Sequence, residues 1–175
     1  MNYKEKFRIV KDFPKEGINF VDVTTVLNDA EAFSYTMSEL YKKISEYEDV
    51  NVIVGTEARG FIFGAALASK MNIRFVPARK PGKLPAETVK STYSLEYGED
   101  SLEIHRDAIK PVDKVVIIDD LLATGGTALS VVKMVKELGG VIKCTAFVVE
   151  IPELKGREKI ERFGIDVISL INFED

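Results

Sequence analysis

The chain has 175 residues, with 24 basic and 28 acidic side chains, a formal net charge of -4 and a single cysteine. This length fits one domain with a substantial core, and the mild negative charge gives no electrostatic reason to expect nucleic-acid binding. No apolar run is long enough to cross a membrane, and the charged start of the chain, MNYKEKFRIV, is unlike a secretory signal. We therefore expect a soluble, cytoplasmic protein without nucleic-acid or membrane partners.

The first 30 residues are expected to form a structured but non-helical flap. Pro14 and Gly17 stop any helix there, and the apolar residues that follow them show no clear period. Apolar residues at helical spacing then predict a crossover helix over residues 32–47, followed by a β strand over residues 50–54. The flap is therefore expected to precede a regular α/β unit.

The segment GTEARG is expected to be a strand-to-helix turn that carries Glu57 and Arg59. Its helix, FIFGAALASKM, is rich in small residues that permit close packing on a sheet, and residues 73–76 predict the next strand. Glu57 and Arg59 either form an exposed ion pair, which would contribute little to stability, or Arg59 faces a polyanion. We favour the second interpretation.

A loop rich in proline and positive charge follows, with the sequence PARKPGKLPAET. Its prolines prevent a helix and hold three cations on the loop, namely Arg79, Lys80 and Lys83. A basic loop is usually solvated, but the phosphate site predicted downstream favours contact with a phosphate-rich substrate. Alternating apolar residues on both sides of residues 98–100 then predict a β hairpin, and its position suits a mobile lid.

The most informative segment is VVIIDDLLATGGTAL, residues 115–129. Its four β-branched residues predict a strand buried on both faces, and two carboxylates, Asp119 and Asp120, follow directly. After a turn of small residues, apolar positions at helical spacing predict a helix, with Thr127 as its N-cap. Because ligands bind at the carboxyl ends of parallel strands, this segment predicts a binding site.

The turn in this segment suits a phosphate group. Gly125 and Gly126 can adopt positive φ and let the backbone approach an anion. Successive N–H groups, the helix dipole and the hydroxyls of Thr124 and Thr127 would then hold it. The turn contains no lysine and lacks the triphosphate and dinucleotide motifs, so a single phosphomonoester is the better-sized ligand. The two upstream acids suit a sugar diol or hydrated Mg2+, which together predicts a ribose 5-phosphate site.

The remaining elements continue the alternation of strands and helices. Glycines 139–140 are expected to close the helix, and they are followed by a strand, a short helix and a last strand over residues 144–149, 155–163 and 166–171. The predicted architecture is α/β, an open and mostly parallel sheet with helices on both faces. We expect one domain over residues 1–175, including the flap in residues 1–30 and the cationic loop and lid hairpin in residues 79–106.

The single cysteine and the single histidine are not expected to form a site. Cys144 lies in an apolar run and is expected to be a buried core residue. It has no cysteine partner in the chain, and no Cys/His cluster suggests zinc. His105 alternates with Leu102 and Ile104, which favours the polar side of a strand or hairpin, with a catalytic role as the minor alternative.

The segment VVIIDDLLATGGTA resembles the phosphoribosyl pyrophosphate (PRPP) signature of the type I phosphoribosyltransferases. The adenine-specific members of that family are also similar in four other segments, FPKEGINFVDVTT, VGTEARGFIFGAALA, FVPARKPGKLPAET and YSLEYGEDSLEIHRDAIKP. Together these segments cover most of the chain in the family's order. The resemblance implies a purine-salvage enzyme that transfers 5-phosphoribose from PRPP to adenine with Mg2+, giving AMP and pyrophosphate, and that works as a homodimer.

The resemblance also implies roles for individual residues. The 5-phosphate would be bound by the turn residues Ala123, Thr124, Gly125, Gly126 and Thr127. The ribose hydroxyls and Mg2+, directly or through water, would be bound by Asp119 and Asp120. The pyrophosphate would be bound by Arg59, Arg79, Lys80 and Lys83. In the family, the turn before Arg59 often contains a strained peptide between Ala58 and Arg59, and the lysine equivalent to Lys83 crosses a dimer interface.

Adenine would be enclosed by the flap and the lid. Phe20 would stack on the base while backbone groups near Asn19 and Val21 read its edge. Many family members carry arginine where this chain has Val21, so a side-chain role at that position would put base selection in doubt. Glu96 would manage the ring protons as a catalytic group beside Arg59, and Tyr97 would close the site.

Two alternative functions remain open at this stage. One is a phosphoribosyltransferase for another base, such as hypoxanthine, guanine, xanthine or uracil, against which the flap and the YSLEYG segment stand. The other is a regulator that senses PRPP and binds nucleic acid without useful catalysis. A regulator would need a DNA-binding domain or a basic face, and the sequence shows neither.

Overall fold

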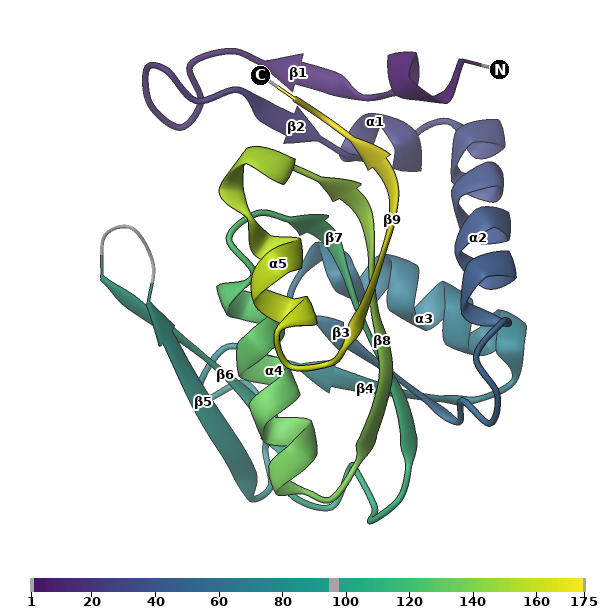
Figure 1. Ribbon diagram of the computed structural model, residues 1–175, viewed down its shortest axis with the longest axis vertical. Coiled ribbons are helices and arrows are strands. Elements are labelled where there is room, and N and C mark those ends of the chain that lie inside the picture. Colours follow the sequence, from purple (N-terminus) through teal and green to yellow (C-terminus); the bar gives the residue numbers. More distant parts are fainter. Residues whose placement is uncertain (1, 95–97, 175) are drawn as a thin grey trace.

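The structure, a computed structural model, describes residues 2–94 and 98–174. A five-stranded parallel sheet has the order β4-β3-β7-β8-β9. The strand bounds are β3 Val52–Thr56, β4 Arg74–Ala78, β7 Lys114–Leu122, β8 Val141–Glu150 and β9 Asp166–Asn172. Helices α2 Ala30–Ile44 and α3 Arg59–Met71 cover one face of this sheet, and α4 Gly126–Glu137 and α5 Gly156–Glu161 cover the other (Figure 1). The predicted open parallel sheet with helices on both faces is confirmed.

Strand β7 shows why the sheet is covered on both sides. Its β-branched residues alternate between two apolar clusters: Val115 and Ile117 pack with α4, whereas Val116 and Ile118 pack with α2 and α3. All four side chains are fully buried, as expected for a central parallel strand. The strand is longer than predicted, because its pairing with β8 continues through Leu122. Both acids of the signature therefore lie inside β7 and not after it.

The flap is formed by η1 Tyr3–Lys6, β1 Arg8–Val10, β2 Phe20–Asp22 and α1 Thr24–Leu27, with β1 and β2 antiparallel. It lies across one end of the molecule, above the sheet in Figure 1. The expectation of a non-helical flap was wrong at η1 and α1. At α1 the Asp22 carboxylate accepts hydrogen bonds from the backbone N–H of Thr24 (2.9 Å) and from its hydroxyl (2.6 Å), and this local contact favours a helical turn.

The predicted hairpin consists of β5 Thr88–Ser94 and β6 Glu99–His105. The sequence predicted a turn over residues 98–100. Ser94 pairs with Glu99, so Glu99 and Asp100 belong to strand β6 instead. Leu102 and Ile104 are buried in the cluster that contains α4. The hairpin is thus packed against the helix that follows the phosphate turn.

Cys144 is buried as predicted, and His105 lies at the end of β6, where its Nε2 accepts a hydrogen bond from Ala86 N (3.3 Å).

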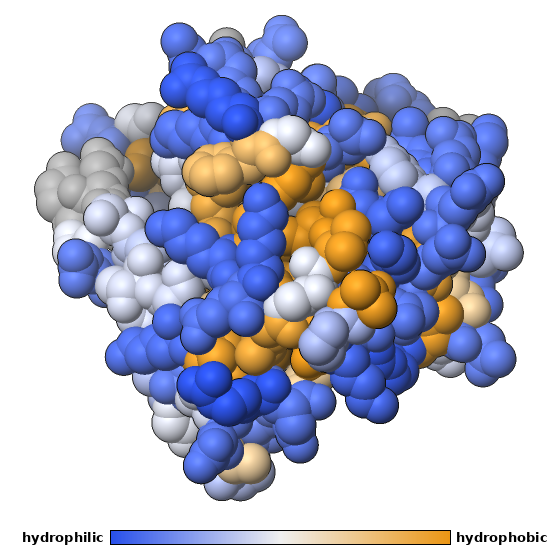
Figure 2. Space-filling view, turned by 60° about the horizontal axis from the view of Figure 1, so that its bottom comes forward, coloured by the Kyte–Doolittle hydropathy of each residue, from blue (hydrophilic) through white to orange (hydrophobic). Residues whose placement is uncertain are grey.

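In the face that Figure 2 shows, hydrophilic side chains surround a central area where apolar side chains reach the surface. Within residues 2–94 and 98–174, no helix is both long and apolar enough to span a membrane.

Candidate active site

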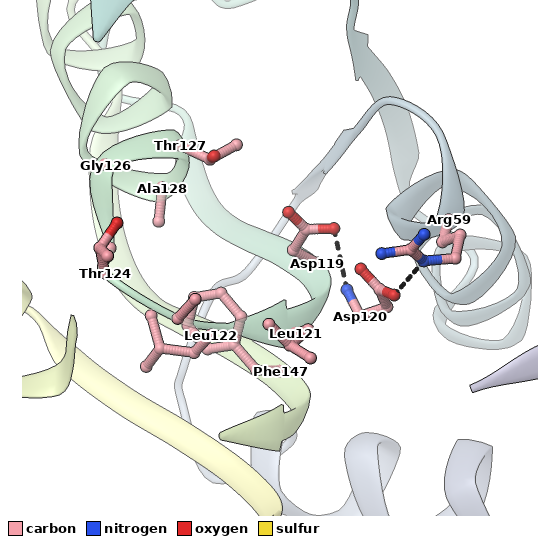
Figure 3. A pocket seen from close by; sticks show the side chains of 12 residues that line it. Arg59, Asp119, Asp120, Leu121, Leu122, Thr124, Gly126, Thr127, Ala128 and Phe147 are labelled. Carbon is pink, nitrogen blue, oxygen red and sulfur yellow. Dashed lines mark hydrogen bonds and ion pairs between the residues drawn. The ribbon is translucent and has the colours of Figure 1, made fainter. Parts of the chain in front are cut away.

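A pocket of about 200 Å3 opens at the carboxyl end of β7, where the strand turns into α4. Figure 3 shows side chains from β7, the turn and α3 around it. The described residues that line it are Arg59, Asp119, Asp120, Leu121, Leu122, Ala123, Thr124, Gly125, Gly126, Thr127, Ala128 and Phe147. The structure therefore brings together both signature acids, all five predicted phosphate-binding residues and Arg59, which is distant in sequence.

The phosphate turn, residues 123–127, has the backbone conformation that its glycines permit. Gly125 adopts φ +82°, a value that residues with a Cβ rarely adopt, and it is the N-cap of α4. Thr127 is not the N-cap as predicted, because the helix already begins at Gly126. The first N–H groups of a helix have no partner within it, so the amino end of α4 presents donors and a positive dipole to the pocket.

The two carboxylates are held in different ways. Asp119 Oδ1 accepts a hydrogen bond from the backbone N–H of Asp120 (2.9 Å), and the Asp120 carboxylate forms an ion pair with Arg59 (Figure 3). Burial, followed by the charge of Asp120, raises the pKa of the Asp119 carboxyl well above its usual range. Among the described residues that line the pocket, Arg59 is the one cation beside these two acids.

Arg59 begins α3 and links the pocket to the flap. Its guanidinium carbon lies 5.7 Å from the centroid of the Phe20 ring, a cation–π distance. The family resemblance suggested a strained peptide between Ala58 and Arg59. The non-proline cis peptide lies one residue earlier, between Glu57 and Ala58. Glu57 pairs with Arg79 (3.1 Å), while Arg59 pairs with Asp120. Of the two interpretations of Arg59, the structure favours a side chain directed at the ligand pocket.

In the cationic loop, Arg79 and Lys80 have protein partners. Arg79 pairs with Glu57, whose other oxygen accepts from the backbone N–H of Lys80 (2.6 Å). The ammonium group of Lys80 forms an ion pair with Asp100 of the hairpin. The side chain of Lys83 is exposed. None of the three cations is among the described residues that line the 200 Å3 pocket, so their contact with a ligand stays a prediction.

The predicted base-binding residues separate according to strand alternation. Phe20 faces Arg59 and also stacks edge-on against Phe13, with ring centroids 5.3 Å apart. Asn19 and Val21 line a second cavity of about 180 Å3 with Ile9, Ile151, Phe173 and Glu174. The Val21 side chain is 4% exposed and belongs to the core cluster, which leaves its backbone as the part that could meet a base on the Phe20 side.

Glu96 and Tyr97 lie outside the described residues, so their predicted roles are neither supported nor contradicted. The strand that leads to them does lie next to the phosphate turn. A Cβ placed on Gly126 would be 3.6 Å from Tyr93 Cδ2 and 3.7 Å from the carbonyl oxygen of Ser94. The hairpin therefore reaches the edge of the pocket.

Two of the residues that shape the pocket and that sequence reasoning missed belong to other elements, β8 and α3. Phe147 of β8 lines it because the register of the parallel pair sets this residue opposite Asp119. Gly60 of α3 is so close to the same acid that a Cβ would lie 2.9 Å from Asp119 Oδ1. Neither contact has a local signal, since both depend on how distant elements pair.

Comparisons with known proteins agree with this geometry. The family model for the phosphoribosyl transferase domain matches residues 24–173. The adenine phosphoribosyltransferase of Clostridium botulinum strain Hall is 53% identical over 173 residues, which make up 99% of each chain. The chain belongs to the adenine phosphoribosyltransferase family. At 52% identity over 174 residues, the adenine phosphoribosyltransferase of Clostridium novyi also covers 99% of each chain.

Solved structures of the adenine phosphoribosyltransferase family share the same fold. The enzyme from Thermoanaerobacter pseudethanolicus superposes with a TM-score of 0.93 at 51% identity, over 98% of each chain. The enzyme from Giardia lamblia, complexed with 9-deazaadenine, gives a TM-score of 0.92 at 31% identity, over 99% of this chain and 97% of that chain. The predicted family and its type I phosphoribosyltransferase fold are confirmed.

Proposed function

We propose that this chain is an adenine phosphoribosyltransferase that converts PRPP and adenine into AMP and pyrophosphate, a reaction of purine salvage. The observation that carries the proposal is one pocket that contains a phosphate-sized turn, two carboxylates and an arginine at the carboxyl end of β7. A Saccharomyces cerevisiae relative, 37% identical over 97% of this chain, was solved with adenine and an imino-altritol bisphosphate. That pair of ligands combines a purine base with a phosphorylated sugar analogue.

In the proposed complex, the turn of residues 123–127 binds the 5-phosphate. Gly125 has the positive φ that aligns successive N–H groups, and the amino end of α4 supplies the dipole. Asp119 and Asp120 lie in β7, just before this turn, and bind the ribose hydroxyls. This division explains why acids and a phosphate turn share one pocket, because the sugar separates them from the phosphate.

Mg2+ is the cofactor that fits these residues. Burial, followed by the charge of Asp120, raises the pKa of Asp119, so a bound cation would favour its ionised form, and carboxylate oxygens are ligands that Mg2+ prefers. No group of three or more metal-ligating side chains occurs within residues 2–94 and 98–174, so PRPP oxygens would complete the coordination, as is usual for Mg2+ with phosphate substrates. When bound, the ion neutralises charge on the departing pyrophosphate.

The pyrophosphate would lie between Arg59 and the cationic loop. The side chain of Arg79 is 33% exposed, so its charge would act on the anion, although its Nε is buried and has no hydrogen-bond partner among the described residues. Lys80 and Lys83 would add charge from the same loop. Positive groups fixed around the leaving oxygen would carry most of the rate enhancement, since charge stabilisation of this kind is usually the largest catalytic contribution.

The reaction breaks the bond between C1 of the ribose and a pyrophosphate oxygen, and N9 of adenine forms the new bond to C1. Both bonds are weak in the transition state, so the ribose has oxocarbenium character that the carboxylates of Asp119 and Asp120 stabilise. The proton on adenine must leave, and we assign its management to Glu96. Glu96→Gln is expected to slow turnover at saturating substrates by about 10²-fold or more, and a rate within about twofold of the parent rules this role out.

Adenine would stack on Phe20 under the flap. Because Val21 is buried in the core, recognition at that position would come from the backbone, which a valine and an arginine supply equally.

A homodimer in the cytoplasm is the proposed working unit. Exposed Lys83 is free to reach a second copy, and sedimentation velocity measures the assembly.

The assignment of adenine is tested with a panel of bases. Turnover is measured with PRPP and Mg2+ for adenine, hypoxanthine, guanine, xanthine and uracil at equal concentrations. We expect adenine to be used at least about 10²-fold better than any other base, because unpaired buried polar groups reject an analogue strongly. Equal or better use of hypoxanthine contradicts the assignment and leaves the phosphoribosyltransferase chemistry in place.

A further inference from the structure

The phosphate turn is supported from outside by a segment that does not line the pocket. After β8, residues 151–155 lead into α5, and the first residue of α5, Gly156, packs against the turn. A Cβ on Gly156 would lie 2.3 Å from the carbonyl oxygen of Ala123 and 3.1 Å from the amide nitrogen of Gly125. A Cβ on Gly125 would in turn lie 3.1 Å from the carbonyl oxygen of Gly156. The two backbones are in direct contact, which requires glycine at position 156.

The residue after Gly156 fixes this contact to the sheet. Arg157 donates to both carboxylate oxygens of Glu150 at the end of β8, at 2.9 and 2.5 Å. It also donates to the carbonyl oxygen of Val167 (2.7 Å) and to Ser169 Oγ (2.9 Å), both in β9. The Ser169 hydroxyl donates to Glu150 (2.6 Å), whose side chain is only 4% exposed. A bidentate pair with these added bonds has a specific geometry, so Gly156 has a defined position relative to β8 and β9.

We propose that Gly156, anchored through the Glu150–Arg157 ion pair, is a positioning residue for the 5-phosphate site. The proposal rests on the proposed function, since it takes the turn of residues 123–127 as that site. The turn is covalently part of β7 and α4, and Gly156 adds a third support from β8 and β9. Donors that converge on one anion lose their effect when displaced by about 1 Å. Gly156 therefore sets the affinity for the phosphoribosyl group without touching it.

The test is Gly156→Ala, which adds one methyl group against Ala123 and introduces no left-handed backbone strain. Binding of ribose 5-phosphate is measured by calorimetry, and KM is measured separately for PRPP and adenine. We expect the Kd for ribose 5-phosphate and the KM for PRPP to rise about tenfold or more, with the KM for adenine within about twofold. This separation distinguishes positioning of the turn from general destabilisation, which affects both substrates.

Gly140→Ala is the matched control. A Cβ on Gly140 would also be crowded, at 2.7 Å from Val135 Cγ1 and 2.9 Å from Ile109 Cγ2, although it would meet side-chain atoms and not a backbone oxygen, and it lies beyond the carboxyl end of α4, away from the turn. Its ribose 5-phosphate affinity and both KM values are expected within about twofold of the parent. If Gly156→Ala changes no more than this control, the proposal is wrong.

Two further variants separate the remaining outcomes. If Gly156→Ala does not fold, as judged by circular dichroism, Glu150→Gln decides: a selective rise in the KM for PRPP supports the proposal, and an unchanged KM overturns it. Gly125→Val tests the site itself. Loss of ribose 5-phosphate binding in Gly125→Val with parental binding in Gly156→Ala refutes only the positioning role. Absence of ribose 5-phosphate binding in the parent refutes the proposed function.

Discussion

Asp119 carries a charge that the ligand-free protein stabilises poorly. Burial and the neighbouring Asp120 raise its pKa above the value of about 3.9 expected in the unfolded chain. Ionisation of this carboxyl therefore opposes folding, and its contribution to stability falls as the pH rises from about 3.9 through the raised pKa. A buried acid whose charge opposes folding is typical of binding sites, where function is often maintained at the expense of stability.

We predict that Asp119→Asn raises the Tm at pH about 7 and abolishes transfer of phosphoribose. Asparagine can still accept the hydrogen bond from Asp120 N without the charge, and each 1 kcal/mol gained corresponds to about 2–4 °C for a chain of this size. The gain should shrink as the pH falls toward about 4. Differential scanning calorimetry across this range measures it.

Asp113→Asn is the control, because the pKa of Asp113 is lowered whereas that of Asp119 is raised. Burial acts against its charge, but the backbone N–H of Lys110 and the side chains of Arg74 and Asn51 outweigh it and lower its pKa. Its Tm should fall at neutral pH. A lower Tm for Asp119→Asn as well would show that the charge of Asp119 is not unfavourable.

At the level of single residues, the sequence identified those whose chemistry is local. The acids and the phosphate turn could be recognised because their types, order and spacing already define a ligand site. Thr127 was wrongly expected to cap α4, since propensity favours threonine there while the positive φ of Gly125 starts the helix earlier. Phe147 was missed because its place depends on the register between β7 and β8.

Helix α2 is stabilised at its start by one carboxylate with two partners. Asp29 Oδ1 accepts from Ala32 N (3.0 Å) as the N-cap, and Oδ2 pairs with Lys6 of η1 (2.6 Å). The same side chain therefore begins the helix and fastens the flap to it. Capping generally contributes more than an exposed ion pair.

We predict that Asp29→Ala lowers the Tm by about 2–4 °C, because the first turn of α2 loses its cap. Asp29→Asn keeps a capping oxygen and loses only the charge opposite Lys6, so its Tm should stay within about 1 °C of the parent at moderate salt. Thermal unfolding followed by circular dichroism compares the variants. Equal losses in both would assign the effect to the ion pair instead of the cap.

The elements themselves were largely predictable, and their ends were not. The parallel strands follow apolar runs, α2 and α4 follow apolar residues at helical spacing, and α3 follows a run of small residues; all three patterns reflect burial in or against the sheet. The extension of β7 through both acids comes from pairing with β8, a contact that periodicity does not contain. Helix α1 was missed because a side-chain bond between Asp22 and Thr24 outweighs the absence of an apolar pattern.

At the scale of the whole molecule, ligand binding should appear as stability. We predict that ribose 5-phosphate at about 100 times its Kd stabilises the fold by about 2.7 kcal/mol, which corresponds to a rise in Tm of about 5–11 °C. PRPP should give a further rise only with Mg2+ present, and chelation of the metal should remove that increment. Thermal shift measurements with each ligand test both statements.

Gly125→Val should remove the ribose 5-phosphate shift, because valine tolerates a φ of +82° poorly and its Cβ would crowd Gly156. Gly164→Val is the matched control, since Gly164 also has positive φ (+72°) but has nothing within 4 Å of a Cβ. It should lose stability and keep the shift. A full shift in Gly125→Val would move the 5-phosphate away from this turn.

The assembly of the site from distant segments was the part least accessible to the sequence. Arg59 and Asp120 are 61 positions apart and meet because β3 and β7 are neighbours in the sheet. The sequence predicted the class of fold, an open and mostly parallel sheet, but not the order of the strands in it. Family resemblance assigned Arg59 and Asp120 to one ligand site, and it did not predict the ion pair between them.

The flap and both chain ends occupy the same end of the molecule (Figure 1). Glu174 lines the cavity that contains Asn19 and Val21, so a tag or fusion partner attached after it would emerge beside the flap that we propose covers the base. Val112, 72% exposed in the loop before β7, lies at the opposite end of that strand from the acids. Attachment to a sensor surface through this loop would leave the pocket facing solution.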